Sequence, residues 1–355
     1  MAPEKRYGRN TTASEVVEGM DLSGKTFFIT GGNAGKGFEA ARALALRNAH
    51  VVIGSRSIVR AMEARGDILE QMRDAKIDIL QLDNADLQSV KDCSEQYIAK
   101  GWPLHCLILN AGVYDPLHRI TDDEFEATFQ VNHLAHFLLT QLLTPVLIKS
   151  APSRVVVVSS DTHRSVGAMG LGLEDITWER LSPTHTHKLN SSLVAYDLSK
   201  LCNVLFAKAL HTRLAPCDVT VNCVNPGIVK TNLQHCKSKL LRSFMIVAKP
   251  WATSAEQAAA ALLYCAVSPD LTPKNGGTYF DHCRAKNPSH TAQNQDIAER
   301  LWELSELMIQ THNQKLQRTC AKLERRASHK SSVSSSQLQT ISEDEENKDG
   351  LERLH

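Results

Sequence analysis

The sequence has almost no net charge, because its 40 basic residues are balanced by 39 acidic ones. No overall electrostatic field would therefore draw nucleic acid or an anionic membrane to the protein. Residues 1–23 are polar and charged, and they contain no apolar stretch like that of a secretion signal or a membrane span. We expect no nucleic-acid partner, no transmembrane segment and a cytoplasmic location.

Cysteine is scattered, with nine residues, no C-x-x-C pair and no Cys/His cluster at the spacing of a zinc site. Most of them lie in apolar segments, as Cys106 and Cys223 do, which favours reduced, buried thiols. His133 and His136 lie one helical turn apart but lack a third ligand, so we interpret them as packing residues. The sequence therefore predicts no metal centre.

What the sequence does contain is a large apolar fraction, 42% of 355 residues, which is enough to bury a sizeable core. Apolar strand segments alternate with helical patterns through residues 25–316, and no internal repeat is visible. This alternation predicts an α/β fold, a doubly wound parallel sheet of the Rossmann type. We divide the chain into a flexible lead-in (1–24), a single domain (25–318) and a disordered, Ser-rich and acidic tail (319–355).

Individual elements follow from the apolar runs and the residues that break them. Strands are expected at 25–30, 50–54, 77–82, 104–109, 154–159, 219–225 and 276–280. Among the helices, one long pattern covers 121–149, with Pro145 ending its regular part, and others end at 214, cover 255–267 and cover 296–314.

A glycine-rich turn follows the first strand directly and opens a helix at Phe38. Glycines in this G-x-x-x-G-x-G spacing permit a tight turn and let backbone N–H groups approach a pyrophosphate at the helix N-terminus. The turn therefore predicts a dinucleotide site formed by Gly31, Asn33, Ala34, Gly35, Lys36 and Gly37.

The end of the second strand bears on which dinucleotide binds. An NAD site usually has an acidic residue here for the ribose diol, whereas this chain has neutral Ser55 followed by Arg56. A guanidinium suits the 2′-phosphate of NADP(H), so we expect NADP(H) rather than NAD(H). The alternative is that Arg56 only ends a strand at the surface.

Three later segments follow strands that should end at the same edge of the sheet. Asp83 and Asn84 would lie near the adenine amino group, although a plain loop explains them as well. The turn formed by Asn110, Ala111 and Gly112 is interpreted as packing close to the cofactor, or as a purely structural turn. A Pro-Gly turn and the residues after it would lie against the nicotinamide carboxamide: Pro226, Gly227, Val229 and Thr231.

Tyr196 and Lys200 are four residues apart, on one face of a predicted helix. A cation one turn away favours the phenolate and should bring the Tyr196 pKa towards neutrality, although such pairs also occur on ordinary solvated helices. Upstream, Ser159 and Ser160 end an apolar strand, and Asn132 lies inside the long helical pattern.

Taken in order, these motifs resemble the short-chain dehydrogenase/reductase family over residues 25–316, and segments 129–134 and 159–164 are similar to its retinol-dehydrogenase-like branch. The resemblance implies hydride transfer between NADP(H) and an alcohol or carbonyl. Tyr196 would be the general acid/base, Lys200 would lower its pKa and hold the nicotinamide ribose, and Ser160, rather than Ser159, would bind the reacting oxygen. Asn132 would keep a water beside Lys200.

The chain departs from the family pattern at three places. Lys36 stands where the family usually has an aliphatic residue, and it would either add to phosphate binding or disturb the turn. Residues 1–24 contain no tryptophan, which leaves no room for the WW domains that some members carry. The tail has no counterpart in the family pattern.

The substrate lid is expected after Gly227, where an apolar island at 240–246 favours an elongated apolar substrate of steroid, retinoid or lipid type. A homodimer contact, a membrane contact or plain core would explain this island equally well. In the tail, Arg325 and Arg326 precede Ser328, a pattern typical of kinase substrates. The alternative function is an NADP(H)-binding interaction protein with weak or no turnover, regulated through that tail.

Overall fold

The computed structural model describes residues 7–115, 117–167, 172–183, 192–227, 252–319 and 321. It divides into two units, Met1–Ser305 and Glu306–His355. The sheet, its flanking helices and every described site residue belong to the first unit, so the account below concerns that unit.

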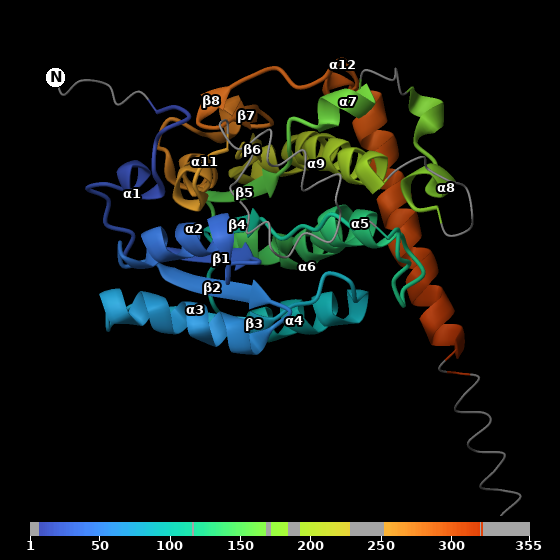
Figure 1. The fold of residues 1–355 in the computed structure, drawn as a ribbon. Coiled ribbons are helices and arrows are strands. Elements are labelled where there is room, and N and C mark those ends of the chain that lie inside the picture. Colours follow the sequence, from blue (N-terminus) through green and yellow to red (C-terminus); the bar gives the residue numbers. More distant parts are fainter. Residues whose placement is uncertain are drawn as a thin grey trace, which may run out of the picture. The chain divides into compact units, whose positions relative to one another are not determined.

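Within the described residues, the centre of the fold is an eight-stranded sheet in the order β3-β2-β1-β4-β5-β6-β7-β8 (Figure 1). Neighbouring strands from β3 to β7 pair in parallel, whereas β8 runs antiparallel to β7. The strands are β1 Thr26–Thr30, β2 His50–Ser55, β3 Ile77–Gln81, β4 Cys106–Leu109, β5 Ser153–Val158, β6 Val219–Asn225, β7 Tyr279–Asp281 and β8 Arg284–Ala285.

Helices connect these strands along the chain. The longer ones are α2 Gly35–Ala45, α3 Ile58–Gln71, α4 Leu87–Ala99, α6 Ala135–Lys149, α9 Ser192–Leu214 and α11 Ala255–Val267. The shorter ones are α1 Ala13–Val16, α5 Ala127–Phe129, α7 His163–Gly167, α8 Trp178–Leu181 and α12 His290–Gln293, and a further helix begins at residue 295.

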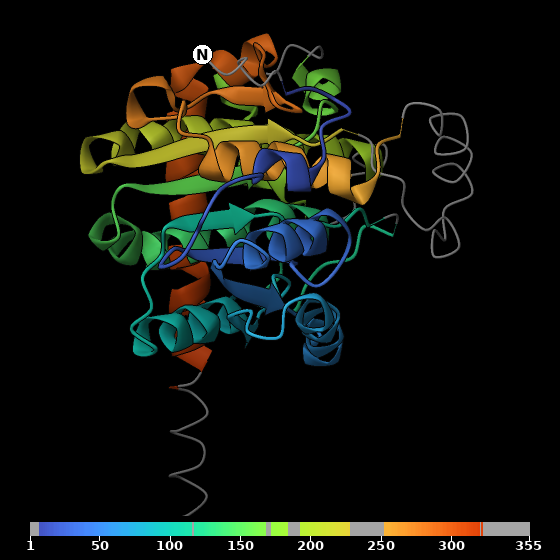
Figure 2. The same cartoon turned by 90° about the vertical axis from the view of Figure 1, so that its left-hand side faces the viewer.

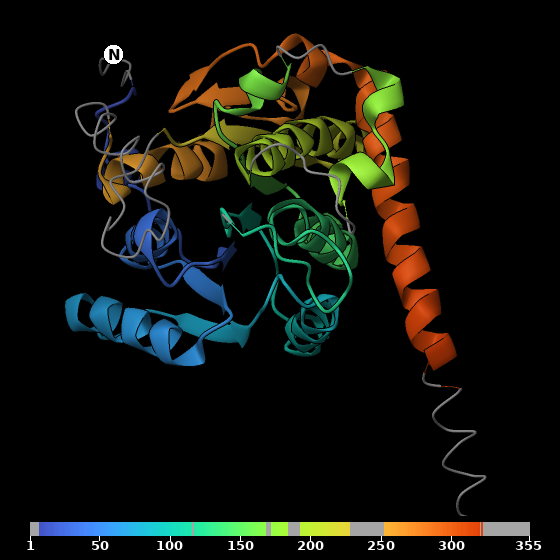
Figure 3. The same cartoon turned by 45° about the vertical axis from the view of Figure 1, so that its right-hand side comes forward.

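Side chains alternate between the two faces of each strand, and helices cover both faces. Phe27 and Ile29 pack in one core cluster with residues of α1, α2, α3 and α11, the face towards the viewer in Figure 2. Phe28 lies on the other face, where its ring stacks on Tyr97 of α4 with centroids 5.3 Å apart. Figure 3 shows α4 and α6 on that second side. The predicted doubly wound α/β fold is confirmed.

The predicted helix over 121–149 is wrong in its first part and in its regularity. The helix starts at Ala127, because the Glu126 carboxylate caps it by accepting from the Phe129 N–H at 2.7 Å. Residues Gln130–Leu134 form a π-helical turn before α6 begins. Pro145 lies inside α6 and does not end it: the helix continues to Lys149, although Pro145 has no N–H to donate to the carbonyl four residues before it.

The described part of the lead-in contains a short helix, α1. Ala13, Val16 and Val17 are buried in the cluster formed with α2 and α11. The N-cap Thr12 and Glu15 form a capping box, and the Tyr7 ring packs edge-on against Tyr264 at 5.8 Å. The short apolar pattern of residues 13–17 was too brief to indicate a helix from sequence, and tertiary packing stabilises it.

One helical stretch, Ala127–Lys149, is long and apolar enough to cross a membrane by composition. Two thirds of its most apolar window, 67%, is buried inside the protein, where Phe137 packs against Phe206 at 5.6 Å. Its apolar character is therefore explained by its place in the core.

The packing of α1 predicts that Val16→Ala lowers the free energy of unfolding by roughly 1–3 kcal/mol, because it removes two buried methyl groups. Guanidinium denaturation followed by circular dichroism measures this change. Asn10→Ala, at an exposed position, is the matched control and should unfold like the parent. Identical midpoints for Val16→Ala and the parent would mean that the lead-in is loose.

Candidate active site

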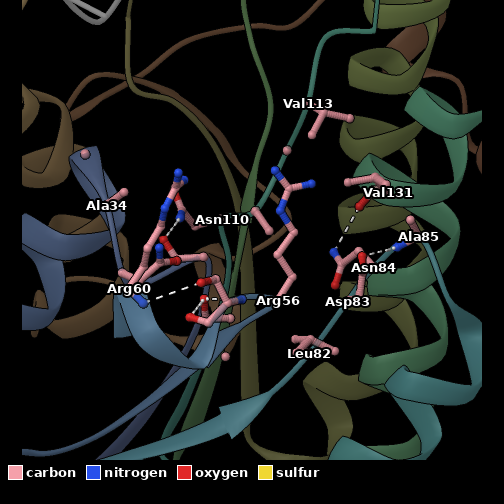
Figure 4. A pocket seen from close by; sticks show the side chains of 18 of the residues that line it. Ala34, Arg56, Arg60, Leu82, Asp83, Asn84, Ala85, Asn110, Val113 and Val131 are labelled. Carbon is pink, nitrogen blue, oxygen red and sulfur yellow. Dashed lines mark hydrogen bonds between the residues drawn. The ribbon is translucent and has the colours of Figure 1, made fainter. Parts of the chain in front are cut away.

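The carboxyl ends of β1 to β4 open onto a cavity of about 400 Å³ (Figure 4). Parallel strands bring their ends to one edge of the sheet, and ligands of such folds bind there. The predicted cofactor residues that line this cavity are Gly31, Asn33, Ala34, Gly35, Lys36, Arg56, Asp83, Asn84, Asn110, Ala111 and Gly112.

The glycine turn is packed so closely that two of its glycines have no room for a side chain. Gly31 has φ +67°, in the left-handed region, and a Cβ there would lie 3.2 Å from the Ala111 Cα. A Cβ on Gly37 would meet the Gly31 carbonyl oxygen and lie 2.5 Å from the Asn110 Nδ2. The backbone of the turn is thus exposed to the cavity at the N-terminus of α2, as a pyrophosphate requires.

A hydroxyl at the end of β1 holds the turns together. Thr30 Oγ1 accepts hydrogen bonds from the backbone N–H groups of Asn110 and Ala111, each at 2.9 Å. It also lies 2.9 Å from His136 Nε2, while His136 Nδ1 lies 3.1 Å from the Asn132 carbonyl. Burial lowers the pKa of His136 to about 3, so its ring is neutral, with Nδ1–H donating to the carbonyl.

Asn110 completes this junction from the second strand end. Its Nδ2 donates to the carbonyl oxygens of Thr30 at 2.9 Å and Gly31 at 3.3 Å, which ties β4 to the glycine turn. Its Oδ1 is buried and has no hydrogen-bond partner among the described residues. A bound group that donates a hydrogen bond would satisfy this acceptor.

Two exposed guanidinium groups lie at the β2 side of the cavity. Figure 4 shows Arg56 and Arg60 beside the pocket, with Asp83 and Asn84 on another part of its wall. Neither arginine forms an ion pair within the described part of the chain. Arg60 was missed from sequence; the signal that could have found it is its place four residues after Arg56, near the start of α3.

Asp83 and Asn84 both hold local structure. The Asp83 carboxylate accepts from the Ala85 N–H at 2.9 Å, closing a turn. The Asn84 Nδ2 donates to the Val131 carbonyl at 3.0 Å and so connects the end of β3 to the π-helical turn. Asn84 therefore stabilises the contact between these two segments.

Tyr196, Lys200 and Ser160 come together beside Gly112. The Ser160 hydroxyl is near enough to the Tyr196 phenol to lower its pKa, and Lys200 Nζ lies 5.4 Å from the Tyr196 ring centroid. Lys200 Nζ is also close to Gly112, since a Cβ there would lie 3.4 Å from it. Ser159 instead donates to the Lys200 carbonyl at 2.6 Å, away from the phenol.

Asn132 braces the loop that follows β4. Its Oδ1 accepts from the Val113 N–H at 2.7 Å, and its Nδ2 donates to the Val113 carbonyl and to Ser199 Oγ, both at 3.0 Å. The π-helical turn gives the backbone the extra residue that points this amide at the loop, and such turns recur at functional sites. Sequence periodicity alone predicts only a regular helix here.

A second tyrosine, missed from sequence, supports Tyr196. The Tyr114 ring lies edge-on to the Tyr196 ring with centroids 6.1 Å apart, and its hydroxyl is 2.6 Å from Ser192 Oγ. Tyr114 lies in the loop after β4, so nothing in its local sequence links it to α9.

The expectation that Lys200 brings the pKa of Tyr196 towards neutrality is wrong for the polypeptide alone. Burial raises the pKa of Tyr196 to about 12, helped by the Asp197 carboxylate and opposed by the Ser160 hydrogen bond. Burial and the charge of Lys36 lower the pKa of Lys200 to about 7, with Cys223 acting in the other direction. Lys200 is therefore only partly charged near neutral pH, which weakens the effect that was expected to lower the Tyr196 pKa, since both groups share one desolvated site.

The remaining predicted site residues follow β6, and only the first two of them are described. Pro226 is buried, and the Gly227 N–H donates to Asn225 Oδ1 at 3.1 Å with Gly227 φ at +81°. Val229, Thr231, the island at 240–246 and the tail from residue 322 lie outside the described residues. The two histidines of the long helix do pack: His133 Nε2 lies 3.0 Å from Ser305 Oγ, among aromatic rings.

Comparisons with known proteins show what this chain is similar to. A family model described as short chain dehydrogenase matches residues 25–170. The WW domain-containing oxidoreductase of Pongo abelii is 44% identical over 306 residues, covering 86% of this chain and 73% of that protein. Retinol dehydrogenase 12 of Mus musculus is 37% identical over 286 residues, covering 81% of this chain and 86% of that protein.

Solved structures agree on the fold. An uncharacterized protein from Mycobacterium Paratuberculosis has a TM-score of 0.63 at 28% identity, covering 84% of this chain and 97% of that one. L-sorbose reductase from Gluconobacter frateurii, complexed with NADPH and L-sorbose, has a TM-score of 0.56 at 18% identity, covering 78% and 99%. At the latter identity the similarity concerns the fold alone.

Close packing of the glycine turn predicts that Gly37→Ala destabilises the protein by about 1–3 kcal/mol, since its Cβ would collide with Gly31 and Asn110. Thermal unfolding measures this loss. The control is Gly66→Ala in α3, where a Cβ meets nothing within 4 Å, and a gain of about 0.5–1 kcal/mol is expected. A parent-like melting temperature for Gly37→Ala would contradict the described packing.

Proposed function

The chain belongs to the short-chain dehydrogenase/reductase family and is an oxidoreductase, and we propose that it transfers a hydride between NADP(H) and an apolar alcohol or carbonyl compound. The observation that carries the proposal is the contact between Ser160 and Tyr196, next to Lys200. This group adjoins Gly112, which lines the cavity at the carboxyl edge of the sheet. A proton donor and a dinucleotide cradle thus lie side by side.

Members of this family bind a nicotinamide cofactor, and two features of the cavity fit one. The close-packed glycine turn exposes backbone to the cavity, and the buried Asn110 Oδ1 is an acceptor without a partner in the described residues. When bound, the nicotinamide supplies or accepts the hydride. We assign four groups of residues to the cofactor. The pyrophosphate is bound by Gly31, Asn33, Ala34, Gly35, Lys36 and Gly37, the 2′-phosphate by Arg56, and the adenine by Asp83 and Asn84. The nicotinamide riboside is bound by Asn110, Ala111, Gly112, Tyr196, Lys200, Pro226, Gly227, Val229 and Thr231.

The protein side of the reaction is proton transfer at the substrate oxygen. Ser160 donates a hydrogen bond to that oxygen, and the Tyr196 hydroxyl gives or takes its proton. Burial raises the pKa of Tyr196 and keeps the phenol protonated, which is the form that an acid in carbonyl reduction must have before it reacts. Asn132 holds the loop after β4 through Val113 and so fixes the wall next to Lys200. General acid–base transfer of this kind contributes about 10²–10⁴-fold in rate.

Preference for NADP(H) is supported by the position of Arg56 and Arg60. Both are exposed, both line the cavity beside the end of β2, and neither has a carboxylate partner among the described residues. Ser55, the position where an acidic residue would favour NAD(H), instead donates from Oγ to the Ser57 carbonyl at 3.0 Å. A phosphomonoester is the cofactor group that two free guanidinium groups would bind.

An apolar substrate remains a proposal from the island at 240–246 and from relatives named as retinol dehydrogenases. A cytoplasmic location is supported by the cysteines, because Cys93, Cys106, Cys202, Cys217, Cys223, Cys265 and Cys283 are all free. A homodimer and phosphorylation of Ser328 by a kinase stay predictions, as do the domain limits at 25–318.

The proposed acid is tested by Tyr196→Phe, which keeps the ring on α9 and removes its proton. Reduction of a panel of apolar carbonyl compounds should fall by at least about 10²-fold, while NADPH binding is retained. The rate of NADPH oxidation and calorimetric binding are the two measurements. Turnover in the variant equal to that of an active parent would refute this mechanism, whereas a parent that binds NADPH without turnover would favour the interaction protein as the alternative function.

Cofactor preference is tested by Arg56→Ala. The parent should bind NADPH more tightly than NADH by about 1.5–3 kcal/mol, the strength of a charge-assisted hydrogen bond, and the variant should lose most of that difference. Calorimetry with both cofactors measures it. Arg65→Ala, an exposed arginine of α3 outside the cavity lining, should keep the parental preference. Equal affinities in the parent would reject the assignment of NADP(H).

A further inference from the structure

Lys36 is the residue of the glycine turn that departs from the family pattern, and its position suits the binding of an anion. It lies in the first turn of α2, is partly buried and lines the cavity. No carboxylate pairs with it among the residues that the structure describes. Burial lowers the pKa of its ammonium group to about 8, so the charge is poorly compensated by the polypeptide.

A second buried lysine lies near it. Lys200 is 4% exposed, and the partner of its Nζ within the described chain is the Val158 carbonyl at 3.4 Å. Its Nζ adjoins Gly112, which lines the same cavity as Lys36, and the charge of Lys36 lowers the pKa of Lys200. Two cations thus share one desolvated site, an arrangement that an anion placed near them would stabilise.

The dinucleotide brings such an anion to this place. A pyrophosphate binds at the N-terminus of the helix that follows the glycine turn, and Lys36 belongs to the first turn of that helix. Resting on the proposed function, we propose that Lys36 pairs with the cofactor pyrophosphate, and that this pairing keeps Lys200 charged beside Tyr196. Cofactor binding and the acid/base group would then be coupled through one residue outside the family motif.

We assign Lys36 to the pyrophosphate rather than to the 2′-phosphate, because it lies in the first turn of α2 and not at the end of β2. The neighbour whose pKa it changes is Lys200 on α9, on the side of Tyr196, whereas Arg56 and Arg60 already serve the β2 end of the cavity. The other titratable groups around the two lysines are Cys223 of β6, His136 of α6, Tyr196 of α9, and Arg56, Arg60 and Asp83 of the cavity lining. His136 is neutral well above its pKa of about 3 and so does not titrate near pH 8.

Proton uptake on binding gives the proposal a readout besides activity. Raising the pKa of a lysine that is partly deprotonated at pH 8 makes it take up a proton when the anion binds. Calorimetry of NADPH binding to the full chain at pH 8, in buffers of different ionisation enthalpy, should show uptake of about one proton per NADPH. The 2′-phosphate, with a pKa near 6, is already fully ionised at that pH and contributes little.

Variants separate Lys36 from the rest of the site. Lys36→Met, neutral and unbranched, should weaken NADPH binding about tenfold and remove most of the proton uptake. The same variant should bind 2′-AMP, which has no pyrophosphate, as the parent does. Lys36→Arg should restore NADPH affinity but not the lysine's own share of the uptake, because guanidinium does not titrate at pH 8. Arg56→Gln should have the opposite effects: it should weaken the binding of 2′-AMP and keep the proton uptake that accompanies NADPH binding.

The outcomes distinguish this proposal from the function on which it rests. If NADPH binds the parent, but Lys36→Met matches it in affinity and proton uptake, the role of Lys36 is overturned and the proposed function stands. A loss of 2′-AMP binding in Lys36→Met equal to its loss of NADPH binding also overturns it, because the effect would then not depend on the pyrophosphate. Failure of the folded parent to bind NADPH overturns both.

Discussion

Burial of a parallel sheet on both faces is the constraint on which this structure depends. Because helices cover Phe27 on one side and Phe28 on the other, polar chemistry is confined to the edges of the sheet. At the carboxyl edge, Thr30 Oγ1 accepts from two N–H groups of the turn after β4 and contacts His136 of α6. One hydroxyl therefore fixes the glycine turn, the neighbouring turn and a core helix relative to one another.

Desolvation of charge sets the chemistry of that edge. Lys200 is almost completely buried, and burial both weakens its own charge and keeps the Tyr196 phenol protonated. Asn132 and Asn84 hold the neighbouring loops through hydrogen bonds to backbone groups, and these loops support the few side chains to which we assign the reaction. Neither Lys36 nor Lys200 has a carboxylate partner among the described residues, and the proposal for Lys36 rests on this uncompensated charge.

Much of the fold could be predicted from sequence because the relevant signals are local. An apolar run such as Val155–Val158 can bury both faces only as an inner strand, and the glycine turn after β1 admits few conformations. The order of the motifs also indicated which strand ends would meet. Elements whose stability comes from distant contacts were missed: α1 is four residues long, and its capping box alone would not hold it without α2 and α11.

By itself, the sequence determined the doubly wound fold, the tight glycine turn after β1 and the position of Lys200 against Tyr196. Hydrophobic periodicity, glycine spacing and the four-residue offset on a helix are all properties of neighbouring residues. Only the tertiary structure decided what depends on three-dimensional surroundings. It turned Asn132 inward through a π-helical turn, brought Tyr114 against Tyr196, and placed Arg60 beside Arg56. It also raised the pKa of Tyr196, where the sequence predicted a lowering. Desolvation depends on all the groups around a site and cannot be read from the spacing of two residues on a helix.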